Sequence, residues 1–539
     1  MPYHYILSIL FFLFSLQTFG QRVKADNSLI GQLKLDINAL AADQMAGRLT
    51  GSPEAANAAD YIERRFTELG IPPYKNKYQW EFTAKTGFRL GKDAYFKIFD
   101  KKLSIGTDVI FFPFGNGNKL SGQVMPNVNE PDNIWLVPAH SLKLNETNNP
   151  QKIIFEFARD AISHGASSVV IFNDVNALQD ISALNLLNFE SLTTPVAFIN
   201  YAAYQQHILP GMKKDWIDVD ARLGVEDASS TGRNVIAMIN NNAPLTIVIG
   251  ANYDHLGIQG EIYNGADNNA SGIAALLALA AQTKDKGLNR YNYLFIAFAG
   301  REQSYQGSTS FLTQNEHSLN TFSCMINLDK VGRLNADKKL FLSGVGTSTA
   351  WLPLLEKNNK QFKLDIDTSG LGYSDHNSFY KKQIPVLHVS TGYHDDFMTP
   401  KDDADKINYS GEAAVINFVS TLLSELDNQT KLSFLKTNDI VSQLEKAKLD
   451  FGIIPDFTFD ENGIRVDYCM ANKLARQSGI KSGDVIIKIG PFKIIDFDDY
   501  LDAMNKTDKN IETAITIKRD DLEYKFFVTF QDYSAAPLK

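Results

Sequence analysis

The stretch FIAFAGREQSYQGS, residues 295–308, runs from an apolar segment into two opposite charges, Arg301 and Glu302. The apolar part predicts a buried strand. In open α/β sheets, ligands collect outside the carboxyl ends of the strands. The charged pair therefore belongs either to a functional site or to an ion pair that closes a loop.

Strands and helices alternate on both sides of this stretch. Apolar stretches at 271–282 and 411–426 predict helices, and the first is too hydrophobic all round for a surface position. The alternation predicts a three-layer α/β domain, in which helices flank a central sheet. The apolar runs that predict strands are NVIAMI (234–239), LTIVIGA (245–251), NYLFIAFA (292–299), FSCMINLD (322–329), KLFLSG (339–344) and PVLHVST (385–391).

A further helix is predicted upstream of the sheet. Ser52 fits an N-cap and Pro53 fits the first helical position, and apolar residues follow at helical spacing as far as Gly70. The helix has a single apolar stripe, which needs a partner. We therefore expect it to pack on the sheet.

Acidic or amide residues follow several of the predicted strands. They are Asn252, Asp254, Asp267, Glu302 and Asp329. Singly, each has a structural explanation, such as capping a helix or ending a strand. Together they favour a functional site, because clustered carboxylates raise one another's pKa unless a cation stands among them.

The composition indicates a globular chain with several domains. Its 539 residues exceed one ordinary core and suggest three or four domains. The net charge of -9 offers no basic face, so we expect no nucleic acid partner. The two cysteines, Cys324 and Cys469, are far apart and predict no disulfide framework.

The chain begins with an apolar run over 6–19, which is too short to span a bilayer and is typical of a signal-peptide core. We expect cleavage near Gly20 and export to the periplasm, the cell surface or the medium. No integral membrane segment is expected after cleavage. An uncleaved anchor and a buried helix are the alternatives.

We divide the chain into six segments. Short strands and turns replace the earlier pattern after residue 105, the polar stretch DASSTGR at 227–233 predicts a hinge, and short strands return at 451. The segments are a signal peptide (1–20), the N-terminal part of the α/β domain (21–105), a β-rich insert (106–226), the α/β core (227–430), a linker (431–450) and a C-terminal β domain (451–535).

Several motifs of the core resemble, in order and spacing, those of metallopeptidase family twenty-eight, the co-catalytic di-zinc aminopeptidases. They are ANYDHLG (251–257), YNGADNNASG (263–272), FAGREQSYQGS (298–308), INLDKVGR (326–333), YSDHNSF (373–379) and GYHDDFMTPKDDADKI (392–407). DQMAGRLTGSPEAANAADYIERRF at 43–66 is similar to the family's N-terminal segment. The insert resembles a protease-associated domain, and FGIIPDF and SGIKSGDVI in the tail resemble a PDZ domain. The resemblance implies an aminopeptidase-type mixed sheet that carries both additions.

The resemblance also implies a site for two zinc ions. It places Asp267 at the ligand that bridges the two ions, Asp329 on the first ion and Glu302 on the second. It places Asp254 at the aspartate that orients a histidine of the first ion.

Three positions depart from the family's pattern. Asn252 and Met398 stand where the two zinc-binding histidines belong, and Arg301 stands where the general-base glutamate belongs. Amide oxygen and thioether are poor zinc donors beside imidazole, thiolate and carboxylate. Arginine cannot act as a base, since its pKa exceeds about 12. We therefore expect zinc to be absent or weakly bound.

Other histidines lie within the same motifs. His255, His376 and His394 match histidines or spacings that the family has outside its ligand set, so we do not expect them to replace the lost ligands. The remaining carboxylates would suit one oxygen-ligated divalent cation, such as Ca²⁺ or Mg²⁺, better than zinc. A site for one such ion is an alternative.

Without metal, Asp267, Glu302 and Asp329 need another source of positive charge. Arg301 is the first candidate, because a guanidinium can contact two carboxylates at once. Lys330, next to Asp329, is the second candidate. The alternative is that Arg301 is a solvated loop residue.

These departures favour an exported pseudopeptidase that binds peptides or proteins. One alternative is an active zinc-dependent aminopeptidase that releases N-terminal residues. The fold favours that alternative and the substitutions oppose it, because losing a general base alone costs about 10²–10⁴ in rate. A scaffold role with one oxygen-ligated ion is the other alternative.

The tail predicts a peptide site of its own. Phe451, Gly452, Ile453 and Ile454 would offer main-chain N–H groups to a peptide carboxylate, while the neighbouring strand edge would accept an added strand. We expect peptides or protein C-termini as partners. The alternative is a domain that only packs against the core.

Overall fold

The computed structural model describes part of the chain. The described residues are 27–112, 119–144, 150–176, 192–213, 216–222, 225–437, 447–456, 459, 461–470, 473–509, 511–520 and 522–530. The expected signal peptide lies outside them, as do residues 438–446 of the linker and 531–535 of the tail. The chain divides into two compact units, Met1–Ala84 with Ser230–Lys539, and Lys85–Ser229.

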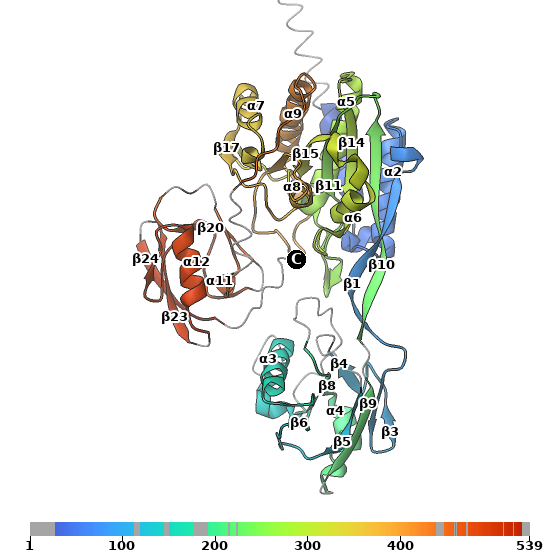
Figure 1. Cartoon of the computed structure of the whole chain (residues 1–539), viewed down its shortest axis with the longest axis vertical. Coiled ribbons are helices and arrows are strands. Elements are labelled where there is room, and N and C mark those ends of the chain that lie inside the picture. Colours follow the sequence, from blue (N-terminus) through green and yellow to red (C-terminus); the bar gives the residue numbers. More distant parts are fainter. Residues whose placement is uncertain are drawn as a thin grey trace, which may run out of the picture. The chain divides into compact units, whose positions relative to one another are not determined.

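A mixed eight-stranded sheet forms the centre of the first unit (Figure 1). β14 is parallel to β11, and β15 is parallel to both β11 and β18. The carboxyl ends of these four strands therefore meet at one edge of the sheet, and all the strands predicted for the core are present. The strand order is β1 (Gln79–Leu90), β10 (Val225–Ile239), β14 (Asn292–Phe298), β11 (Thr246–Asn252), β15 (Phe322–Leu328), β18 (Val386–Ser390), β16 (Lys339–Ser343) and β17 (Lys363–Ile366).

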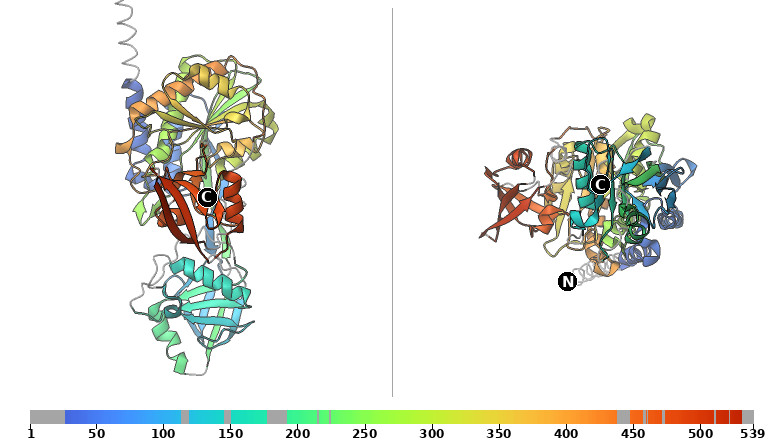
Figure 2. Two further views of the ribbon diagram at one scale, coloured as in Figure 1. Left: turned by 90° about the vertical axis from the view of Figure 1, so that its left-hand side faces the viewer. Right: turned by 90° about the horizontal axis from the view of Figure 1, so that it is seen from below.

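Helices cover both faces of this sheet (Figure 2). Tyr293, Phe295 and Ala297 of β14 belong to one apolar core, and Leu294 and Ile296 belong to a second core on the other face. This arrangement confirms the predicted helix–sheet–helix layers. The first core includes residues of α2 (Pro53–Glu68), α5 (Gly272–Asp285), α7 (Trp351–Asn358) and α9 (Tyr409–Leu426), and the second includes residues of α6 (Gln306–Gln314) and α8 (His376–Tyr380).

Helix α2 begins as the sequence predicts. The Ser52 side chain accepts a hydrogen bond from the Ala55 N–H at 3.1 Å, and Pro53 is the first helical residue. Ile62 and Phe66 are fully buried in the first apolar core, which also contains residues of the sheet. The expectation that this helix packs on the sheet is confirmed.

A small β domain follows the core within the same unit. Its strand order is β19 (Ile453–Pro455), β20 (Ile464–Cys469), β21 (Val485–Ile489), β23 (Glu512–Arg519) and β24 (Leu522–Thr529), with β22 (Phe492–Lys493) paired to β21. Helices α11 (Leu474–Gln477) and α12 (Phe497–Lys506) accompany it, and a separate apolar core fills it. In the SGIKSGD turn, Gly479 and Gly483 have φ of +91° and +88°, a backbone conformation that glycine adopts without steric cost.

A bulge interrupts the pairing of β19 with β20. Ile454 pairs with Tyr468, whereas Pro455 pairs with Val466, so Asp467 is the extra residue. A bulge of this kind re-aims the side chain that it carries.

The second unit contains two four-stranded sheets. One has the order β3 (Lys101–Leu103), β2 (Tyr95–Ile98), β9 (Ile217–Arg222) and β5 (Lys119–Val124). The other has the order β4 (Val109–Phe111), β8 (Val196–Ile199), β7 (Ser168–Phe172) and β6 (Ile134–Pro138), accompanied by α3 (Pro150–Ser163) and α4 (Tyr201–Ala203). The unit begins at Lys85 rather than at 106, because β2 pairs with β9 and thereby joins this sheet.

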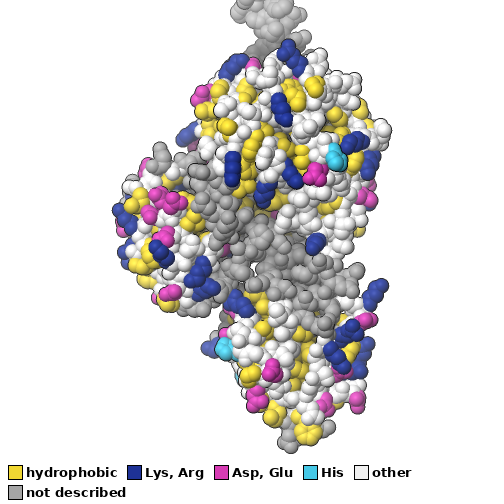
Figure 3. Space-filling model, viewed as in Figure 1, with side chains coloured by type: hydrophobic (Ala, Val, Ile, Leu, Met, Phe, Trp, Pro, Cys, Tyr) yellow, Lys and Arg dark blue, Asp and Glu magenta, His cyan; other side chains and the backbone are white. Residues whose placement is uncertain are grey.

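Charged side chains are mixed on the surface. On the face drawn in Figure 3, Lys and Arg side chains are interspersed with Asp and Glu side chains, without an extended area of one sign. Among the described residues, no helix combines the length and the apolar character needed to cross a membrane.

Candidate functional site

The sheet edge brings most of the predicted site residues together. Asn252 is the last residue of β11 and lies in register with Phe298, the last residue of β14. Arg301 and Glu302 follow β14 closely, and Asp329 follows β15 directly. Because these strands are parallel neighbours, their carboxyl ends deliver the side chains to one place.

Arg301 is an internal ion-pair partner of this site, not a solvated loop residue. Its guanidinium contacts the Glu302 carboxylate, and its Nη2 lies 3.4 Å from Asp329 Oδ2 and donates to the Tyr373 carbonyl at 3.0 Å. The Arg301 side chain is only 7% exposed. Burial alone would lower the pKa of Arg301, but the carboxylates of Glu302 and Asp329 raise it well above its usual value. The guanidinium is therefore charged at every physiological pH.

Lys330 adds a second cation beside Asp329. Its Nζ lies 2.8 Å from Asp329 Oδ2 and sits over the rings of Tyr393 and Phe397, at 5.1 and 5.3 Å from their centroids. Burial of Asp329 opposes ionisation, yet Lys330 and Arg301 hold the pKa of this carboxyl well below its usual range. Asp329 is therefore ionised and carries two basic partners.

Asp267 enters from η7 (Ala266–Ser271), the turn that leads into α5. Its Oδ1 accepts hydrogen bonds from the Gly332 N–H at 2.7 Å and the Ser271 hydroxyl at 3.0 Å. Its Oδ2 lies 3.2 Å from His394 Nε2. His394, which the sequence argument set aside, is therefore a third basic side chain at the site. In the sequence, the only signal for a role of His394 was its position within the motif at 392–407.

Asp254 fixes the loop that carries Arg301. Its carboxylate accepts hydrogen bonds from the Thr50 hydroxyl at 2.9 Å and from the N–H groups of Arg301 and Glu302, both at 3.3 Å. Burial raises the pKa of Asp254 to about 6, and repulsion from Glu302 adds to this shift. The Asn252 side-chain amide donates from Nδ2 to the main-chain carbonyl of Asp254 at 3.1 Å.

The two positions at which the family resemblance led us to expect histidines hold neutral side chains. Asn252 Oδ1 accepts a hydrogen bond from Asn269 Nδ2 at 3.1 Å, and the Met398 sulfur accepts one from Asn268 Nδ2 at 3.5 Å. Within the described ranges, no group of three or more His, Cys, Asp or Glu side chains is arranged to hold a metal ion. With an amide, a thioether and two buried cations in place, this donor set does not fit a pair of zinc ions.

Two carboxylate oxygens of the site have no hydrogen-bond donor among the described residues. They are Asp267 Oδ2 and Asp329 Oδ1, both deeply buried. Carboxylate oxygens are ligands that Ca²⁺ and Mg²⁺ prefer. If one oxygen-ligated ion binds at this site, these two atoms are its available ligands.

The expected peptide-binding loop of the tail is tied to its own domain. Gly452 has φ of +78°, and its N–H donates to Asp450 Oδ1 at 2.7 Å. Phe451, Ile453 and Ile454 are buried. The Gly452 N–H therefore already has a carboxylate partner, and a peptide carboxylate would have to replace Asp450 there.

The C-terminal β domain reaches the candidate site through one aromatic cluster. The Tyr468 ring stacks on Tyr393 with centroids 4.9 Å apart, and its hydroxyl donates to the Phe397 carbonyl at 3.2 Å. Tyr393 and Phe397 are also the rings beneath Lys330. The loop that carries Met398 is thus held from the C-terminal side.

The core of the chain matches a known family. Residues 234–423 match the family model described as Peptidase family M28. The chain is 25% identical over 259 residues to "Uncharacterized protein YfbL" of Escherichia coli (strain K12), a match that covers 39% of this chain and 77% of that protein. It is 37% identical over 99 residues to "BOS complex subunit NCLN" of Canis lupus familiaris, a match that covers 16% of this chain and 18% of that protein. A solved zinc aminopeptidase from Bacillus subtilis is similar at 18% identity and a TM-score of 0.46, with 76% of this chain and 98% of that chain covered.

Proposed function

We propose that this chain is an exported pseudopeptidase. Its Peptidase family M28 domain binds peptides or proteins and does not hydrolyse them. The support is chemical. The position of the general base holds a guanidinium, and neither histidine position offers an imidazole. A site of this composition lacks the groups that activate water in the family.

The double contact of Arg301 with Glu302 and Asp329 carries this proposal. The guanidinium supplies the positive charge that clustered carboxylates require. A unit positive charge about 4 Å from a divalent ion opposes it by about 8 kcal/mol at an effective dielectric constant of 20. Arg301 thus stabilises the metal-free carboxylates and disfavours a metal beside them.

A binding role agrees with one of the matched relatives. By its printed name, that relative is a subunit of a complex. It resembles this chain over a short segment only, so the likeness names no partner for this chain. Peptides or protein C-termini are the ligands we propose, with the C-terminal β domain acting as a PDZ domain and the second unit as a protease-associated insert.

Restoring the family's groups tests the proposal. The variant combines Asn252→His, Arg301→Glu and Met398→His, and a second version adds Lys330→Met because the Lys330 ammonium occupies Asp329 Oδ2. The wild-type chain is expected to release no nitroaniline from aminoacyl-nitroanilides in the presence of Zn²⁺, whereas the restored variants gain turnover. Lys381→Glu, on an exposed residue, controls for the change of charge. Turnover by the wild-type chain above that of the Asp267→Asn variant would refute the proposal.

A further inference from the structure

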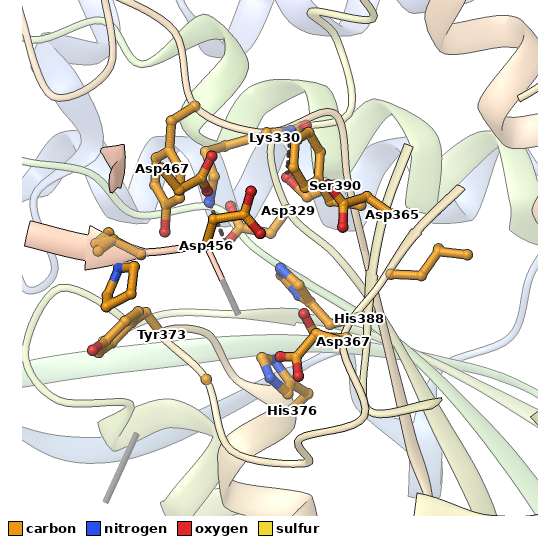
Figure 4. Close-up of a pocket in the computed structure, with 18 of the residues that line it drawn as sticks. Asp329, Lys330, Asp365, Asp367, Tyr373, His376, His388, Ser390, Asp456 and Asp467 are labelled. Carbon is orange, nitrogen blue, oxygen red and sulfur yellow. Dashed lines mark hydrogen bonds and ion pairs between the residues drawn. The ribbon is translucent and has the colours of Figure 1, made fainter. Parts of the chain in front are cut away.

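A cavity of about 110 Å³ is lined by Asp329 and Lys330 of the candidate site and by residues of β16 and β18. Figure 4 shows it in close-up. Its walls come from the core and from β19 and β20 of the C-terminal β domain. Five aspartates line it, namely Asp329, Asp365, Asp367, Asp456 and Asp467. The cavity is therefore acidic, and the charges around it decide what it can hold.

Three of these aspartates have basic partners. Asp329 is paired with Lys330 and Arg301, Asp365 lies 2.5 Å from Lys339 Nζ, and Asp456 accepts a hydrogen bond from Arg465 Nε at 2.8 Å. The other two aspartates, Asp367 and Asp467, have no such partner among the described residues, because no basic side chain there forms an ion pair with either of them.

Burial raises the pKa of both of these aspartates. Asp467 is the extra residue at the bulge of β20 and has no paired residue on β19. Burial raises the pKa of Asp467 to about 7, and repulsion from Asp456 adds to the shift. Burial also raises the pKa of Asp367 to about 6, although the Ser369 N–H donates to it at 2.9 Å.

Two histidines give the cavity neutral polar groups. His376 and His388 stack with ring centroids 4.5 Å apart, and burial lowers the pKa of both. His376 is only 1% exposed, and among the described residues neither of its ring nitrogens has a hydrogen-bond partner. A buried polar side chain of this kind, on the wall of a cavity, can form a hydrogen bond with a group bound there.

The remaining wall is partly polar, through Lys330, Ser343 and Ser390, and partly apolar. Phe341, Leu371, Tyr373 and Ile454 line the same cavity. An open cleft adjoins it, shares Asp365, Asp456 and Asp467 with it, and runs along β17, the last strand in the sheet order. An extended peptide can add to such a strand edge while one of its side chains enters a pocket.

We propose that this cavity binds the side chain of a lysine or arginine residue of a peptide, whose charge is balanced by Asp367 and Asp467. The aliphatic part of that side chain lies along the apolar wall, and the neutral imidazole of His376 supplies a further hydrogen-bond partner. The inference rests on the proposed binding function and names the class of its ligand.

The first test compares two peptides on the full chain by isothermal titration calorimetry. The probes are acetyl-Ala-Ala-Lys-Ala-Ala-amide and the same peptide with norleucine in place of lysine, which keeps the aliphatic stem and removes the charge. The lysine peptide is expected to bind at least tenfold more tightly. Equal binding of the two peptides would overturn the basic-ligand inference and leave the binding function standing, whereas absence of binding by any peptide would overturn both.

The second test uses variants of the chain. Asp467→Asn and Asp367→Asn are each expected to reduce the tenfold preference to threefold or less, while Asp498→Asn, on an exposed aspartate of α12, retains it. An unchanged preference in both cavity variants would overturn the inference. The final measurement is the binding of cadaverine alone to the full chain. If it binds as tightly as the lysine peptide, the ligand is a small amine, and the assignment to a peptide fails.

Discussion

At position 301 one guanidinium contacts two buried carboxylates, those of Glu302 and Asp329. The sequence predicted this pairing, because basic residues stand beside two members of a cluster of carboxylates. It did not predict that His394 lies 3.2 Å from Asp267, since His394 belongs to the loop after β18, whose path depends on tertiary packing. Spacing along the chain identifies which residues leave a strand end, but it does not determine where a long loop returns.

The Arg301→Ala substitution leaves Glu302 buried without its cation. We expect the free energy of unfolding to fall by about 3 kcal/mol, the cost typical of breaking a buried ion pair. Urea unfolding followed by circular dichroism measures it. Adding Glu302→Gln to Arg301→Ala should restore at least half of the loss, because the unpaired charge is then removed. A loss below about 0.5 kcal/mol would mean that the pair contributes little.

At the level of elements, the positions of the strands and helices were largely predictable from the sequence. The directions in which individual side chains point were not. The buried runs of the core and the N-cap at Ser52 follow from local rules. The bulge at Asp467 could not be predicted from local rules, since apolar and polar residues alternate from Ile464 to Tyr468 as they would in a regular strand. The contact of Tyr468 with Tyr393 and Phe397 joins segments about 70 residues apart, and no local signal encodes it.

The bulge gives peptide binding a pH dependence. A pKa of about 7 leaves Asp467 mostly protonated below neutrality, so it loses the charge that attracts a cation. Of the other charged groups that influence it, Asp456 and Asp365 raise this pKa, whereas Lys339 and Arg465 lower it. Affinity for the lysine peptide should therefore fall about tenfold between pH 8 and pH 6. Calorimetry of the Asp467→Asn variant should show less than threefold change over the same range. An equally steep profile in that variant would assign the effect to another group.

At the level of the whole molecule, the two units have separate apolar cores. The composition and the change of pattern along the chain predicted an inserted segment, but placed its start at 106. The structure places the boundary at Lys85, because pairing of β2 with β9 defines the unit. Such long-range pairing cannot be inferred from the pattern of a single short strand.

Removal of residues 85–229 tests the independence of the first unit. Joining Ala84 to Ser230 through an Asn-Gly turn connects two neighbouring strands of the eight-stranded sheet, β1 and β10. We expect the shortened chain to unfold within about 5 °C of the full chain in differential scanning calorimetry, because its cores are untouched. An insoluble product, or a transition far below this range, would show that the first unit depends on the second.

The zinc content of the wild-type chain, purified in excess ZnCl₂ and dialysed before mass-spectrometric metal analysis, tests the central claim most directly. With guanidinium and ammonium groups on the carboxylates, we expect less than one zinc ion per chain. Two retained zinc ions per chain would contradict the account, because two divalent ions cannot share Glu302 and Asp329 with Arg301 at the contacts described.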